Sequence, residues 1–217
     1  HGSSHFLLGL ICYDEKMLVP SFLSLEMFLL LEQYTSRSEG ALVNLSRMSI
    51  QGLEGSGGRA NSDFEEVELI FNSGMALTKQ YKSKVKFYDP ISQQTQMLCE
   101  KLEYDEDSDN FWMKNYVPLF KEIYNSENYE TFIHFLFLSS GNPKVQAKIE
   151  KWVIKNRESA IEFALWANQW ITENMSEKEM EIDGKKQKIK HWYDPSEHTL
   201  EAVGNTKEID ADSSINV

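Results

Sequence analysis

The chain of 217 residues is long enough for one large domain or for an extended array of small units. Hydrophobic residues make up 41% and aromatic residues 12% of it, which is enough for a packed core and excludes wholesale disorder. It carries 22 lysines and arginines against 34 aspartates and glutamates, and the net charge of -12 repels phosphate backbones and anionic lipids. The one basic stretch that stands out, GKKQKIKH at 184–191, directly follows a run rich in acids. We therefore expect no nucleic-acid partner.

The longest apolar run, from Phe6 to Tyr13, is far shorter than the stretch of about 20 residues that crosses a bilayer, so we expect no membrane insertion. The chain opens with HGSSHFLL and no methionine, so we expect it to be part of a longer protein. Cys12 and Cys99 each lie among apolar residues, which is typical of buried free thiols. The sequence does not determine the cellular compartment or the oligomeric state.

The first well-defined element is a helical hairpin, predicted for HFLLGLICYDEKMLVPSFLSLEMFLLLEQ at 5–33. Pro20 suits the first turn of its second helix. That helix is apolar almost all round, so it must be sandwiched between neighbours. A hairpin that cannot bury its own faces is the unit of a solenoid. Helical spacing predicts that four apolar side chains of the first helix share its inward face: Phe6, Leu7, Leu10 and Ile11.

Particular residues of this hairpin match a known repeat. Leu8 and Gly9 form a Leu-Gly pair in the first helix, while Ser21 and Leu25 supply a small and a large apolar residue in the second. The pattern resembles a tetratricopeptide repeat, in which a glycine such as Gly9 lets the second helix approach closely, at a helix-propensity cost of about 1 kcal/mol. The resemblance implies an all-α fold of hairpins stacked as a short solenoid or right-handed superhelix, and a role in binding proteins. Substituted signature positions include Cys12, where an aromatic is usual, and Gln33, where the closing proline is.

Composition divides the chain into four regions. The hairpin and a following helix occupy 1–50, and a flexible glycine-rich loop occupies 51–62. That loop lacks the lysine and the serine or threonine of a phosphate-binding loop. A longer α-helical region covers 63–175, and 176–217 holds a small β-hairpin, predicted from an Asp-Gly pair, and an acidic, disordered tail.

Apolar periodicity and capping signals place the remaining helices. Ser62 followed by Glu65 predicts a capping box, and the stripe that follows includes Leu69 and Met75. Leu165 belongs to the predicted inward face of the last helix. The predicted helices are 36–50, 62–82, 89–104 starting at Asp89-Pro90, two within 108–143 separated near Ser126 with Pro118 in an opening turn or kink, 142–156 and 157–175.

An acidic stretch between two of these helices has the spacing of a calcium loop. Asp105, Asp107 and Asp109 take its first, third and fifth positions. Tyr116 stands at the twelfth position, where a glutamate is required. Capping of the following helix by Ser108 or Asp109 accounts for the same residues without a metal.

Two alternatives from other classes stay open. His191 and His198 bracket two acids and could contribute to a metal site. Cys99 has no local partner that marks it as a nucleophile, although a distant histidine could meet it in the fold. The protein could thus be a small helical metal-dependent hydrolase with a site of scattered His, Asp and Glu, or the C-terminal accessory part of a larger protein with tetratricopeptide repeats.

Aromatic residues recur every three to four positions from Phe111 to Tyr124. Most of these rings are expected in the core, and a minority could line a groove that takes a partner's helix or peptide. The leading hypothesis is a non-enzymatic helical-repeat protein that binds a protein or peptide in a scaffolding or assembly role, with no catalytic residue, cofactor or metal. The candidate partner-binding residues are Trp112, Tyr116, Phe120, Tyr124 and Tyr129.

Overall fold

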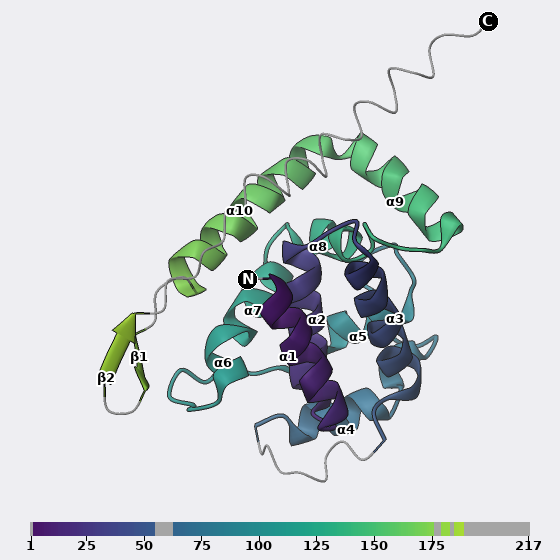
Figure 1. The fold of residues 1–217 in the computed structure, drawn as a ribbon. Coiled ribbons are helices and arrows are strands. Elements are labelled where there is room, and N and C mark those ends of the chain that lie inside the picture. The colour runs from purple at the N-terminus through teal and green to yellow at the C-terminus, as the bar shows by residue number, and fades with distance from the viewer. Residues whose placement is uncertain (1, 55–62, 176–178, 183–184, 189–217) are drawn as a thin grey trace, which may run out of the picture.

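The computed structural model describes residues 2–54, 63–175, 179–182 and 185–188, and it confirms the expected all-α fold (Figure 1). The helices are α1 (Gly2–Asp14), α2 (Leu18–Leu31), α3 (Ser36–Gln51), α4 (Glu65–Asn72), the 3-10 turn η1 (Met75–Leu77), α5 (Pro90–Lys101), α6 (Phe111–Asn115), α7 (Val117–Asn125), α8 (Tyr129–Leu136), α9 (Pro143–Lys155) and α10 (Arg157–Met175).

The expected β-hairpin pairs β1 (Glu179–Ile182) with β2 (Lys185–Lys188) in antiparallel fashion. The Asp-Gly pair predicted to form its turn lies outside the described residues, and so do most of the glycine-rich loop and the whole predicted tail.

Helix α2 is the centre of the fold. All 14 of its residues are buried, because α1, α3, α4 and α8 pack around it (Figure 1). The prediction that this helix is sandwiched is therefore confirmed. Two of these neighbours, α1 and α3, flank α2 in the chain, whereas α4 and α8 come from later segments. Helix α1 is likewise joined to a residue 111 positions away by the hydrogen bond between His5 and Tyr116. Because a unit of a solenoid contacts mainly its neighbours in sequence, the predicted solenoid arrangement is not confirmed.

Gly9 brings α1 unusually close to α2. A β-carbon at this position would lie 2.7 Å from both Cγ and Cδ2 of Leu25. The hydroxyl of Ser21 donates a hydrogen bond of 2.8 Å to the carbonyl of Gly9, so backbone and side chain meet across the two helices. The close approach predicted for Gly9 is confirmed.

The inward face of α1 differs from the predicted one. Leu7 and Ile11 are 58% and 59% exposed, whereas His5 and Cys12 are buried on the same side as Gly9. The close contact at Gly9 decides which side faces α2, because any other side would place a larger side chain there. The prediction that Leu7 and Ile11 face inward is wrong for this reason.

Replacing Gly9 with alanine should lower the free energy of unfolding, although alanine is the better helix former. The added β-carbon overpacks the contact with Leu25, which is 0% exposed and has no room to move away. We therefore expect a cost of about 2–3 kcal/mol, which exceeds the propensity gain of about 1 kcal/mol. Gly40 of α3 is the matched control, because a β-carbon there meets no atom within 4 Å. Gly40→Ala should therefore stabilise the protein by about 1 kcal/mol. Urea denaturation of both variants measures the two effects, and equal signs would contradict the close contact.

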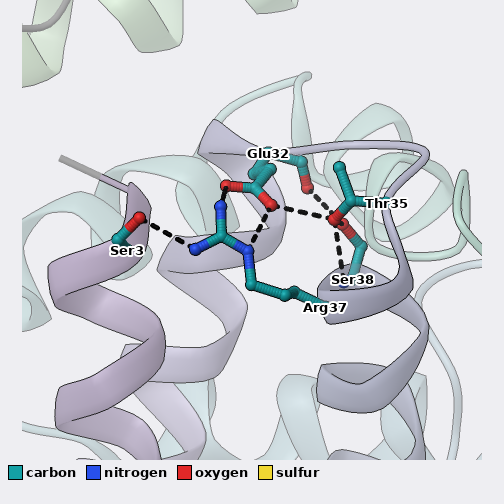
Figure 2. Close-up of polar contacts among 5 residues, drawn as sticks. All are labelled: Ser3, Glu32, Thr35, Arg37 and Ser38. Atoms are coloured by element: carbon teal, nitrogen blue, oxygen red, sulfur yellow. Dashed lines mark hydrogen bonds and ion pairs between the residues drawn. The ribbon is translucent and has the colours of Figure 1, made fainter.

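Polar contacts at the end of α2 join three helices (Figure 2). Arg37 of α3 donates to both carboxylate oxygens of Glu32, at 3.0 and 2.6 Å, and to the hydroxyl of Ser3 on α1 at 2.9 Å. Thr35 caps α3, since its side-chain oxygen accepts the backbone N–H of Ser38 at 3.2 Å. These bonds set the position of α3 relative to the hairpin.

The helix predicted over 62–82 is shorter than expected. Helix α4 ends at Asn72, and Gly74 takes the left-handed conformation with φ of 67°, which stops the helix. Leu69 and Met75 are 63% and 45% exposed, so their prediction as buried residues is wrong. The chain turns before it can carry Met75 to the same side as the buried part of α4.

The observed ends of α5 and α7 agree better with the helix ends predicted from the sequence. Asp89 forms a capping box at the start of α5, and Pro118 lies in the opening turn of α7, which ends before Ser126 as predicted. A further break at Tyr116 separates α6 from α7. Leu165 of α10 is 56% exposed, so its predicted inward direction is wrong.

Helices α9 and α10 form an outer edge of the fold (Figure 1). Phe163 of α10 is 1% exposed and contacts Phe135 of α8 edge to face, with 5.0 Å between ring centroids. Trp152 of α9 stacks on His134 of α8 at 4.0 Å. Each of the two helices is thus attached by one side and leaves its other side facing away from the core.

Candidate partner-binding surface

The structure places the five predicted partner-binding aromatics in two environments. Tyr116, Phe120 and Tyr129 are 1%, 0% and 1% exposed and belong to the core. A partner could contact these three rings only if the surrounding helices separated. Trp112 and Tyr124 are half-buried and reach the surface. Their contact with a partner stays a prediction.

Tyr124 belongs to a polar cluster between α5 and α7. The hydroxyls of Tyr81 and Tyr124 donate to the two carboxylate oxygens of Glu100, each at 3.0 Å. Lys84 donates to the backbone carbonyl of Tyr124, and its ammonium lies 4.3 Å from the centroid of that ring. Burial, followed by the hydrogen bond to Glu100, raises the pKa of Tyr124 to about 12. The charged and polar groups of this cluster form hydrogen bonds with one another. These bonds hold the segment that contains Tyr81 and Lys84 against α5 and α7.

A buried acid lies close to this cluster and was missed by sequence reasoning. Glu26 of α2 is 1% exposed, and one of its carboxyl oxygens accepts a hydrogen bond from the hydroxyl of Thr95. The other oxygen, Oε2, has no hydrogen-bond partner among the described residues. Burial raises the pKa of Glu26 to about 8, against the opposing effect of Thr95, so the carboxyl is mostly protonated at pH 7. Its signal in the sequence is that it is the one charged residue of an otherwise uncharged helix.

Two further protonated groups lie near Glu26. Burial raises the pKa of the Cys99 thiol well above its ordinary value, and the charge of Glu26 acts in the same direction. Burial also raises the pKa of Tyr129, whose hydroxyl has no partner among the described residues. The raised pKa keeps Cys99 as a thiol. Since the thiolate is the reactive form of cysteine, the site does not activate Cys99 as a nucleophile. The prediction that Cys12 and Cys99 are buried free thiols is confirmed.

The predicted calcium-like acids are used in local contacts. Asp105 accepts a hydrogen bond from the backbone N–H of Asp107 at 3.0 Å, and Asp109 forms an ion pair of 3.0 Å with Lys114. Within the described ranges, no group of three or more His, Cys, Asp and Glu residues could hold a metal ion.

The cap of α6 is Asn110, whose side-chain oxygen accepts two backbone N–H groups of the first turn. The prediction of Ser108 or Asp109 as the cap is wrong by one or two residues. Asn110 reaches the free N–H groups from the position next to the helix, where an asparagine is among the best caps. His191 and His198, the residues of the metal-site alternative, lie outside the described residues.

A row of four lysines on α9 is the surface feature that sequence reasoning missed. Their side chains are exposed, and helical geometry places them within an arc of roughly 60° over about 16 Å. In the part of the chain that the structure describes, none of their ammonium groups forms an ion pair. The alternating spacing of four, three and four residues is the signal that could have revealed them. This lysine row consists of Lys144, Lys148, Lys151 and Lys155.

The opposite side of α9 holds the lysine row in place. Ile149 and Val153 are 0% and 5% exposed and face the core, next to the stack of Trp152 on His134. Ile154 lies at the edge of the row and is 56% exposed. A single acid, Glu150, accompanies the four lysines on this helix. The result is a locally basic face on a chain whose net charge is -12.

The fold defines the protein as all-α, and none of the helices in the described segments is both long and apolar enough to span a bilayer. No protein-family model matches the chain, no curated protein matches it, and no solved structure matches it. The resemblance to a tetratricopeptide repeat therefore depends on the residues of the first hairpin alone.

Proposed function

We propose that the protein is a non-enzymatic helical domain that binds a partner protein through the lysine row of α9. The observation that carries this proposal is a set of four exposed ammonium groups on one face of a helix, none of which pairs with an acid among the described residues, in an otherwise acidic chain. Like charges three or four residues apart on a helix repel one another. Carboxylates of a partner would relieve this repulsion. The spacing of the four lysines therefore supports binding of an acidic partner.

Two further features support the same class of function. The lysine row lies on a helix that is attached to the core by Ile149 and Val153, so its side chains start from fixed backbone positions. A partner can then be bound without the cost of ordering the backbone of α9. The resemblance of the first hairpin to tetratricopeptide repeats, which act in scaffolding and assembly, favours protein binding as well.

Reversing two charges of the lysine row should abolish binding of the partner protein. We expect Lys148→Glu combined with Lys151→Glu to abolish cross-links that the wild-type chain forms in the cells that make it. The cross-links are formed by a photoreactive amino acid placed at the exposed Glu150 in every variant, so that they do not depend on lysine chemistry, and they are measured by quantitative mass spectrometry. Both side chains are exposed, so the variant should unfold at the same temperature as the wild type.

The matched control changes the same amount of charge elsewhere. Lys79 and Lys86 are exposed and distant in sequence from α9, so Lys79→Glu with Lys86→Glu should retain every cross-link. A partner that is kept equally by the wild type and by both double variants would overturn the proposed function.

A further inference from the structure

We infer that the partner segment recognised by the lysine row is an acidic amphipathic helix that lies along α9. Its carboxylates would face the row, and its apolar side chains would contact Ala147 and Ile154. This inference rests on the proposed function and specifies the chemistry of the partner.

The spacing of the row is the first reason. Positions four, three and four residues apart are those that one side of a helix presents, so a second helix alongside presents its own side chains at the same intervals. The row extends over about three helical turns, or about 16 Å. A helical partner can therefore place a carboxylate near each of the four ammonium groups at once, which an irregular peptide cannot do without losing more conformational freedom.

A short apolar seam beside the row is the second reason. Ala147 and Ile154 are seven residues apart, so they lie on the same side of α9, and both are exposed. Ile154 keeps 56% of its surface open, and the small side chain of Ala147 permits close approach. Apolar positions seven apart with charges along their flank are the arrangement by which two helices pair.

The other flank of the seam sets the orientation of charge on the partner. Glu150 is exposed on the side of Ala147 and Ile154 that faces away from the lysine row. The partner helix should accordingly be acidic along one flank and neutral or basic along the other. Such a pattern distinguishes this partner from a uniformly acidic segment.

The same features disfavour a membrane or a nucleic acid. Both present negative charge over an area much wider than a single row of lysines, and they would bring that charge against Glu150 and against Glu158 at the start of α10. The net charge of -12 repels them at longer range. The row also contains lysines only, which lack the two-pronged geometry by which arginine binds phosphate.

A designed peptide tests the inference directly. The probe is a fluorescent helical peptide of three heptads with leucines along one seam, glutamates on one flank and lysines on the other. The comparison peptide has the same composition with the glutamates distributed around the helix. Fluorescence anisotropy with the full chain in low salt should show binding of the probe at least about tenfold tighter than of the comparison peptide.

Variants then assign the contact to α9. Lys148→Glu with Lys151→Glu should weaken binding of the probe by about tenfold, and Lys79→Glu with Lys86→Glu should leave it unchanged. Ile154→Ser should weaken it by roughly fivefold without any change of charge. Ile50 of α3 is 60% exposed, so Ile50→Ser is the matched control and should have no effect.

Equal affinity for the two peptides would overturn the inference. An affinity for the probe that is unchanged in the double variant of the row and in Ile154→Ser would overturn it as well. It would also fall if phosphatidylserine vesicles or duplex RNA bound in place of the probe and lost binding in the double variant of the row. If the cellular cross-links depend on the row while the probe does not bind, the acidic-helix inference fails and the proposed function stands. If the cross-links are also independent of the row, both fail.

Discussion

Replacing Glu26 with glutamine should raise the free energy of unfolding by about 3 kcal/mol at pH 7 and leave it nearly unchanged at pH 4. Burial raises the pKa of this carboxyl from 4.5 to about 8, so the folded protein binds a proton that the unfolded chain has already released at neutral pH. Each pH unit in this interval costs about 1.4 kcal/mol of stability. Glutamine keeps an oxygen for the hydroxyl of Thr95 and cannot ionise.

The sign of the pH dependence follows from the raised pKa. Below pH 4.5 the carboxyl is protonated in both states, and its favourable contribution to stability is fully present. As the pH rises from 4.5 towards 8, the unfolded chain releases its proton first, and the wild-type protein loses stability until the folded carboxyl also ionises. The difference between Glu26→Gln and wild type should therefore grow over this interval and become constant above it.

Urea denaturation from pH 4 to pH 9 measures this difference. Glu103→Gln is the control, because it removes one carboxyl from an exposed position. Other groups, such as His134, whose pKa burial lowers, titrate equally in both proteins and cancel in the comparison. A difference that stays constant from pH 4 to pH 8 would show that Glu26 is not a buried, neutral acid.

Replacing Phe163 with alanine should cost about 3–5 kcal/mol and act first on the outer edge of the fold. The ring is 1% exposed and contacts Phe135 at 5.0 Å and Phe132 at 6.4 Å between centroids, so its removal leaves a cavity between α10 and α8. Since α10 contacts mainly α8 and α9, we expect it to open before the core does.

Native-state hydrogen exchange measures this loss helix by helix. The amides of α10 should lose protection in Phe163→Ala, while those of α2 keep it until global unfolding. Leu165→Ala is the control on the same helix, because Leu165 is 56% exposed and its truncation should change stability by less than about 0.5 kcal/mol. Unchanged protection of α10 in Phe163→Ala would mean that other contacts hold this helix in place.

Features that depend on a few adjacent residues could be predicted from the sequence. The capping box at Asp89, the proline in the first turn of α7 and the burial of α2 depend on local chemistry or on an unmistakable apolar run. Gly9 belongs with them, since a glycine within an apolar helix that precedes a second apolar helix indicates close packing, which the more polar surroundings of Gly40 in α3 do not. These signals set most helix boundaries and the fold class.

Features that depend on which neighbour covers a helix could not be predicted in this way. Leu7 and Ile11 have the same spacing as a buried face, yet the contact at Gly9 turns α1 so that they are exposed. The burial of Glu26 depends on α5, which lies far along the chain. The lysine row is different, because its signal, lysines spaced four, three and four residues apart, is present in the sequence itself.

The position of α2 also has a consequence for synthesis of the protein. This helix ends at Leu31, but α8, one of the helices that cover it, ends at Leu136. At a translation rate of about 5–20 residues per second, the most apolar segment of the chain stays without part of its cover for on the order of 5–20 s. The nascent chain is therefore expected to be a ribosome-associated chaperone client until the helix that ends at Leu136 has emerged.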